Sequence, residues 1–399
     1  MRDQKVSHMG MDCHKNFSRV TARDASGQVL WRGRLEHRDR AALRAELSQW
    51  PKVPVVLEGT FGWGWISDEL SRAGQEPHLA SGRKVAGWRE VRGIAKSNKL
   101  DADLLSELWT QPQRWWEVWL APPTVRDGRE WLRYRMGLVG MQTAIKNRIH
   151  ATLHRHGIFC DESDLFGKAG WRFLQQLAHA DGATLRDSTR RTLGGYLQLL
   201  KSIRQMIAQV TRELRRQVRQ STQAQLWRSL PGINWVLAYT IAAEIGPIER
   251  FANHKHLASY GLVAAMADDS GEEDVTTPVG RHVGQIGRRT LKWALIAAAR
   301  NAVRKDQHFR DIFNRRSDEG KRDKGRSYIA VARALCRVGF SCVKNQRPYS
   351  PTPPPRPGTK AKTDSAKENN DALANKVLNG STSRPGMGQS ERGLVAAGR

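Results

Sequence analysis

The sequence predicts an α/β sheet domain at the start of the chain, followed by a mainly helical remainder. Two observations support this fold class. Over the first part of the chain, short runs with apolar residues at every second position alternate with helix-like runs. Beyond about residue 110, long segments instead repeat apolar residues every three or four positions, as amphipathic helices do. The change of period predicts a domain boundary near residue 110.

The first domain is expected to contain three strands, a helix, a further strand and then alternating elements. The expected strands are KVSHMGMDC, FSRVTARD, VLWRGRLEH, the β-branched run VPVVLEGT and, fifth, EPHLAS. Gly27 lies in the second turn. Asp39 is placed to cap the helix DRAALRAELSQW, and Gly74 ends the helix ISDELSRAG. KSNKLDADLLSELW predicts a later helix, so this sheet domain covers about residues 1–110.

The rest of the chain divides by composition. Residues 111–225 predict a helical linker with a coiled coil, because Leu200, Ile203, Ile207, Val210 and Leu214 alternate spacings of three and four. Pairing within one chain, pairing between chains and an ordinary core helix all explain this seam. Residues 226–345 predict another mainly helical unit. Residues 346–399 are rich in Pro, Ser and Lys with few apolar residues, which predicts disorder.

The charge of the chain indicates a polyanionic partner. The 66 lysines and arginines exceed the 39 acids, which leaves a net charge of +27. Such a field attracts nucleic acid first and an anionic membrane surface second. No signal-like segment and no apolar run of membrane-spanning length are present. The four cysteines lack C-x-x-C spacing, which argues against a zinc ribbon or disulfide framework and fits a reducing cytoplasm.

Acidic residues lie where strands are expected to end. Asp12 ends the first strand and Glu58 ends the buried strand, and strand ends in α/β sheets open onto crevices. Asn98 and Asp101 are three positions apart, so they share a helix face, whereas Asp103 points elsewhere. If that face packs beside the strand ends, these oxygen ligands suit Mg²⁺. Capping or a surface ion pair explains either strand-end acid alone.

Ser270 lies in an acidic stretch, MADDSGEEDVTTPVGRH, just before a Gly/Arg loop. An ordinary Ser-Gly turn is the simplest interpretation, and the spacing fails the calcium-loop pattern. The following loop and helix carry Gly residues that let the backbone approach phosphates, and they carry four candidate nucleic-acid-binding residues: Arg281, Arg288, Arg289 and Lys292. Upstream, SLPGINWVLAYTIAAEIG resembles a helix-hairpin-helix, which would offer backbone N–H groups to a phosphate. Asn234 takes the place of the usual second glycine, because asparagine also tolerates left-handed geometry.

In this order, MGMDCHK, VVLEGTFGWGW, KSNKLDADLL, LASYGLVAAMADDSG, GRRTLKWALIAAA and KGRSYIAVARALCR resemble the motifs of the DEDD insertion-sequence transposases, the family that includes the Piv DNA invertase. The resemblance covers about residues 6–345. It implies a RuvC-like, RNase H-type first domain and a C-terminal transposase domain whose serine, Ser270, forms a covalent phosphoserine link to DNA. Asp12, Glu58, Asn98 and Asp101 would bind Mg²⁺, with Asp12, Glu58 and Asp101 also catalytic.

The resemblance also implies partners. These are the DNA of the element ends and target, a structured guide RNA from the element, and further copies of the chain in a dimer or tetramer assembled through the coiled coil. The location would be cytoplasmic, with the nucleoid. Two features depart from the family pattern: Asn98 stands where the family has Asp, and Glu272, Glu273 and Asp274 make the stretch after Ser270 unusually acidic.

Two other functions fit the residues. The first is a metal-dependent junction nuclease that uses water instead of serine. The second is a basic nucleic-acid-binding protein that has lost catalysis.

Overall fold

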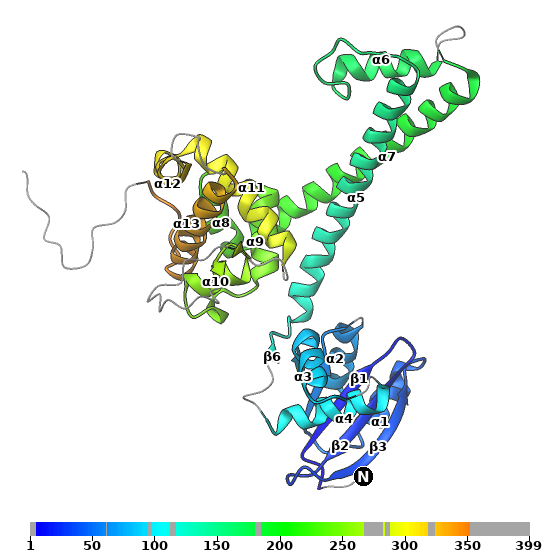
Figure 1. Ribbon diagram of the computed structural model, residues 1–399, viewed down its shortest axis with the longest axis vertical. Helices are drawn as coiled ribbons and strands as arrows, with labels where there is room; N and C mark the ends of the chain where they lie inside the picture. The colour runs from blue at the N-terminus through cyan, green and yellow to red at the C-terminus, as the bar shows by residue number, and fades with distance from the viewer. Residues whose placement is uncertain are drawn as a thin grey trace, which may run out of the picture. The chain divides into compact units, whose positions relative to one another are not determined.

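The computed structural model describes residues 5–60, 62–94, 97–111, 117–179, 185–266, 282–283, 288–317 and 324–351 (Figure 1). The chain divides into two compact units, residues 1–349 and 350–399. Nearly all of the second unit, and with it the tail expected to be disordered, lies outside the described residues.

A mixed six-stranded sheet in the order β3-β2-β1-β4-β5-β6 forms the N-terminal part. Its strands are β1 (His8–Cys13), β2 (Phe17–Arg23), β3 (Val29–Glu36), β4 (Pro54–Glu58), β5 (Glu76–Ala80) and β6 (Glu117–Val118). The first three strands form an antiparallel meander, whereas β1, β4 and β5 run parallel. This confirms the expected α/β character. The edge strand β6, antiparallel to β5, was not expected.

Helices cover both faces of this sheet. They are α1 (Arg40–Leu47), α2 (Trp63–Arg72), α3 (Gly82–Val91) and α4 (Asn98–Trp109). Val55 and Leu57 of β4 belong to the core that includes α1 and α2, and Val56 between them belongs to the core of α3 and α4. Successive strand side chains point to opposite faces, which is why one apolar run serves two cores. The helix α3 was missed by the sequence analysis.

Two long helices, α5 (Pro123–Arg155) and α7 (Asp187–Gln220), run side by side, and the shorter α6 (Lys168–His179) packs against α7 at one end of the pair (Figure 1). Tyr134 contacts Met206 near one end of the pair and His156 contacts Thr189 near the other, so the helices are antiparallel. Four residues of the α7 seam are buried within one chain and Ile207 is partly buried, so the seam packs against neighbours of the same chain, chiefly α5.

The remaining elements are mainly helical. They are α8 (Thr222–Ser229), α9 (Trp235–Ile245), the 3₁₀ helix η1 (Ile248–Arg250), α10 (His254–Tyr260), β7 (Ala265–Met266), β8 (His282–Val283), α11 (Arg289–Lys305), α12 (Gln307–Ser317) and α13 (Lys324–Lys344). Trp227 is fully buried, and Gly339 of α13 leaves room for its ring. This part confirms the expected mainly helical C-terminal region.

No helix in the described ranges is long and apolar enough to cross a membrane. The four cysteines, all described, are free thiols. Cys13, Cys336 and Cys342 are buried, and burial raises the pKa of Cys13 and of Cys336 to about 12.

Candidate active site

Two acids occupy the carboxyl ends of neighbouring parallel strands. Met11 of β1 pairs with Leu57 of β4, so Asp12 and Glu58 follow at the same level of the sheet. Asp12 is 8% exposed and Glu58 is half-buried. A side chain at Gly82 would collide with Glu58, because an added Cβ would lie 2.2 Å from the Glu58 Oε1 atom. The start of α3 therefore leaves space for this carboxylate.

The helix α4 places Asp101 near Asp12. Ser97 caps α4 by accepting a hydrogen bond from the Leu100 N–H at 3.2 Å, and Asp101 lies in the first turn. The helix crosses β1 at Gly10, where an added Cβ would lie 2.1 Å from the Ser106 nitrogen. Only a glycine permits this approach, because any side chain would hold the helix away from the strand.

The electrostatics of this site favour a proton or a cation. Burial raises the pKa of Asp12, and the negative charge of Asp101 raises it further, against the lowering effects of His14 and Arg89. The Asp12 Oδ2 atom lies 3.0 Å from His14 Nε2, and Asp101 Oδ1 lies 3.5 Å from Arg89 Nη1.

Neither contact has hydrogen-bond geometry. Asp12 Oδ2 and Asp101 Oδ1 are both buried without a hydrogen-bond partner among the described residues. Buried polar atoms in folded proteins are nearly always hydrogen-bonded, whereas these two oxygens have only the ion-pair contacts with His14 and Arg89 beside them. Carboxylate oxygens are the ligands that divalent magnesium prefers, and these two fit that role.

The metal ligands expected from the sequence are brought together only in part. Within the described ranges, no three His, Cys, Asp or Glu side chains lie close enough to hold a metal ion. Glu58 is directed over Gly82, and Asp101 is drawn toward Arg89. Asn98 is the first residue of α4, but its side chain lies outside the described residues. His14 and Arg89 were not anticipated from the sequence.

Asp103 belongs to a different environment. Its Oδ1 atom accepts hydrogen bonds from Thr21 Oγ1 at 2.7 Å and from Arg32 Nε at 2.8 Å. Burial alone would raise the pKa of Asp103, but these hydrogen bonds outweigh burial and lower it. Asp103 therefore ties α4 to β2 and β3 of the sheet.

The serine and the loop around it lie outside the described residues. Ser270 and Arg281 therefore have no described position. Arg288 is half-buried and donates to Glu244 at 3.5 Å, so it stabilises the fold at the start of α11. Arg289 and Lys292 follow on α11 and line a shallow cavity of about 330 Å³.

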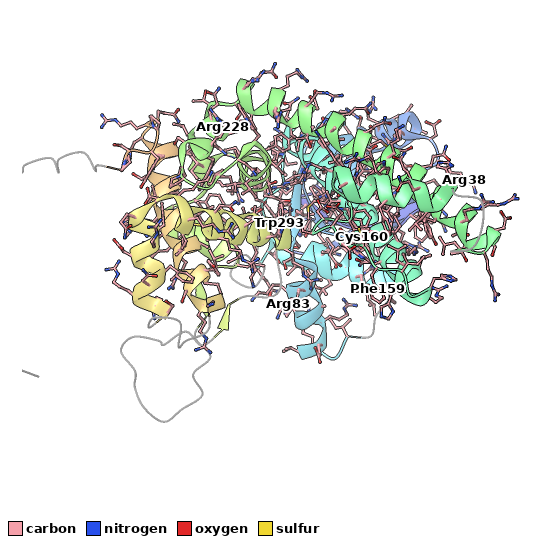
Figure 2. The ribbon with its side chains drawn as sticks, turned by 90° about the horizontal axis from the view of Figure 1, so that it is seen from above. Arg38, Arg83, Phe159, Cys160, Arg228 and Trp293 are labelled. Carbon is pink, nitrogen blue, oxygen red and sulfur yellow. The ribbon has the colours of Figure 1, made fainter. Side chains whose placement is uncertain are left out.

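That cavity contains two residues that the sequence analysis missed. Trp293, labelled in Figure 2, is 45% exposed on α11, and Arg300 lies two turns further along the same face. Lys292, Trp293 and Arg300 follow Arg289 by three, four and eleven residues, and this helical spacing could have revealed the face. An exposed indole among cations is suited to stacking on a nucleic-acid base.

The Pro-Gly hairpin before α9 packs on α11. Gly232 has a φ of +83°, and an added Cβ would lie 2.4 Å from the Ala302 nitrogen. The interpretation of Asn234 as a substitute for a left-handed glycine is wrong. Asn234 has a φ of −88° and caps α9 by accepting from the Leu237 N–H at 3.0 Å.

Comparison with known proteins agrees with this architecture. Residues 9–158 match the family model of the DEDD transposases of IS110 type, and residues 224–314 match that of the IS116/IS110/IS902 transposase family. The transposase for insertion sequence element IS1111A of Coxiella burnetii is 24% identical over 88% of this chain and 92% of its own length. The transposase for insertion sequence element IS1328 of Yersinia enterocolitica is 24% identical over 74% of this chain and 83% of its own length.

A probable family 20 transposase of Pseudomonas aeruginosa is also 24% identical, over 75% of this chain and 85% of its own length. One family model thus covers the strand-end acids and α4, and the other covers α9 to α11 and the serine position between them. The chain belongs to the DEDD insertion-sequence transposases, enzymes that cut and rejoin DNA.

Proposed function

We propose that this transposase cuts and rejoins element ends with Ser270 as its nucleophile and with Mg²⁺ bound at the N-terminal acids. The observation that carries the metal proposal is the pair of buried carboxylate oxygens, on Asp12 and Asp101, that lack a hydrogen-bond partner. The sheet order and the helices on both faces support a RuvC-like, RNase H-type assignment for this domain.

Asp12 and Asp101 would hold the ion, with Glu58 turning from Gly82 toward it and Asn98 adding a neutral oxygen. Bound Mg²⁺ would supply positive charge to the reacting phosphodiester. Arg89 would have to release Asp101, because a guanidinium and a divalent cation repel each other. A neutral Asn98 ligand predicts weaker metal binding than a carboxylate would give.

The proposed covalent step uses the serine hydroxyl. The Ser270 oxygen attacks a phosphorus of the DNA backbone, its proton passes to a base, and the bond from phosphorus to the leaving strand oxygen breaks. The leaving oxygen takes up a proton, so the leaving strand ends in a hydroxyl and the serine holds the phosphate. Attack by a hydroxyl of another strand then restores the serine and completes the exchange without an external energy source.

Nucleic-acid contacts are proposed at the loop and helix after the serine. Arg281, Arg289 and Lys292 would contact DNA phosphates, and Trp293 adds a stacking surface. Arg288 would act chiefly through Glu244, as its ion pair indicates. The family resemblance supports a guide RNA and a homo-oligomer as further partners, in the cytoplasm with the nucleoid.

One experiment separates the serine mechanism from a water-using nuclease. Purified protein is incubated with Mg²⁺ and labelled DNA carrying the element ends, together with the element's noncoding RNA. Wild type should form a denaturation-resistant protein–DNA adduct, and Ser270→Ala should lose both the adduct and strand cleavage. Cleavage that persists without an adduct in Ser270→Ala would establish the nuclease mechanism instead.

Metal binding is tested separately by following Mn²⁺ by electron paramagnetic resonance. Asp12→Asn and Asp101→Asn should each weaken Mn²⁺ binding, whereas Asp103→Asn, on the same helix, should leave it unchanged. Asn98→Asp should strengthen it. Equal Mn²⁺ binding by wild type and Asp12→Asn would contradict the metal site and favour a non-catalytic nucleic-acid-binding protein.

A further inference from the structure

A second basic site is built from residues of the C-terminal helices and shares none with the acids of the sheet. The helices α10, α12 and α13 enclose an open cavity of about 710 Å³. Five of its lining residues carry a permanent positive charge: Lys255, Arg315, Arg316, Arg333 and Arg337. The cations come from all three helices, so the cavity forms only when the C-terminal part folds.

No acid balances this charge within the described part of the chain. No Asp or Glu lines the cavity, and none of its five cations forms an ion pair with a described carboxylate. Elsewhere in the chain, exposed arginines do find acids, as Arg190 does with Asp187 and Arg216 with Glu213. Like charges gathered in a concave surface repel one another and attract an anion.

The rest of the lining is largely apolar, and we call its apolar part the floor of the cavity. Alanines and one isoleucine form it: Ala258, Ala264, Ile312, Ala330 and Ala334. Apart from His254 and His308, the lining has no uncharged polar side chain. Phosphates could bind the cations while the flat face of a base covers the floor. The volume lies within the range of about 300–1,000 Å³ that is usual for small-molecule pockets.

We propose that this cavity binds an unpaired stretch of DNA, with backbone phosphates on the five cations and at least one base against the alanine floor. We commit to DNA because the chain belongs to enzymes that cut and rejoin DNA, and because His254 and His308 are the only uncharged polar side chains of the lining that could select for a 2′-hydroxyl. The site is separate from the strand-end acids and from the α11 face. It therefore holds whether or not Ser270 is the nucleophile.

The charge contribution is tested with a double variant, Arg316→Gln with Arg333→Gln, in the full chain. Its control is Arg304→Gln with Arg326→Gln, which removes the same charge from α11 and α13 at positions that do not line the cavity. Binding of a fluorescent oligothymidylate is measured by anisotropy across a range of salt concentrations, without divalent metal.

The variant Arg316→Gln with Arg333→Gln should bind oligothymidylate at least about tenfold more weakly than wild type, because each lost contact is a hydrogen bond between a charged side chain and a phosphate. The slope of log affinity against log salt should fall by about 1.4, that is about 0.7 for each of two phosphates. The control should keep the wild-type slope. Equal changes in both variants would overturn the proposal, since they would reflect net charge alone.

The base contact is tested with Ala330→Leu, which fills the floor without changing charge. Wild type should prefer oligothymidylate to an abasic deoxyribose-phosphate strand of the same length, and Ala330→Leu should reduce that preference. An unchanged preference would refute base insertion. Oligouridylate is the RNA arm: if Arg316→Gln with Arg333→Gln weakens its binding as much as that of oligothymidylate, the assignment to DNA is wrong.

Discussion

Gly10 is the position at which a single methyl group should disturb both the sheet domain and the candidate metal site. The chain of α4 crosses β1 there, and an added Cβ would lie 2.1 Å from the Ser106 nitrogen and 2.4 Å from the Ala102 oxygen. Ordinary van der Waals contact begins at 3.4 Å. Both obstructing atoms are backbone, so α4 must move away from β1 by about 1 Å or more.

We expect Gly10→Ala to lower the stability of this packing by about 1–3 kcal/mol, the usual cost of overpacking a core. Amide hydrogens of α4 and β1 should then exchange roughly 5- to 150-fold faster, since 1.4 kcal/mol corresponds to a factor of about ten. Hydrogen exchange read by mass spectrometry resolves these segments in the intact chain. Moving α4 also withdraws Asp101 from Asp12, so Mn²⁺ binding should weaken.

The matched control is Gly87→Ala in α3. Nothing lies within 4 Å of an added Cβ there, so the methyl group removes backbone freedom without a collision. A helix interior gains about 0.5–1 kcal/mol from such a change. Exchange in α3 should slow slightly. If the amide hydrogens of α4 and β1 exchanged at the wild-type rate in Gly10→Ala, the close approach of helix and strand would not restrict position 10 to glycine.

Three further perturbations test the helical part. Arg129→Met should cost about 3–5 kcal/mol in thermal unfolding, because it removes the hydrogen bonds from Arg129 to the backbone carbonyls of Ala243 and Glu244 and leaves the buried Glu244 carboxylate with Arg288, 3.5 Å away, as its remaining ion-pair partner. Pairing it with Glu244→Gln should cost less than the sum of the two single changes. Trp227→Ala should cost about 3–5 kcal/mol, whereas Trp227→Phe, which removes an unpaired buried N–H, should cost less. Hydrogen bonds from Arg216 and Gln217 lower the pKa of Glu213 from 4.5 to about 2, so its stabilising contribution is present above pH 4.5 and is lost as pH falls toward 2. Melting temperatures of wild type and Glu213→Gln should therefore converge over that pH interval, and a constant difference would contradict the assignment.

The acids of the candidate site could be predicted from the sequence, because the ends of the expected strands can be recognised there. Asp12 and Glu58 each lie at the end of a run of apolar, strand-forming residues. Asp101 is three positions after Asn98 and shares its helix face, whereas Asp103 does not. His14 and Arg89 could not be inferred in the same way. Arg89 reaches Asp101 from α3, a helix whose short segment GRKVAGWREV lacks a strong apolar period and so does not predict a helix.

The sequence alone determined the class of each region and the order of the motifs, since apolar periodicity and charge are properties of neighbouring residues. Only the tertiary structure decided that the α7 seam pairs with α5 of the same chain, that Asn234 caps a helix, and that five separated cations line one cavity. Such contacts join residues far apart in the chain. The geometry of these contacts depends on close packing of one backbone segment against another, as at Gly10 and Gly232. A pattern of neighbouring residues in the sequence does not predict such packing.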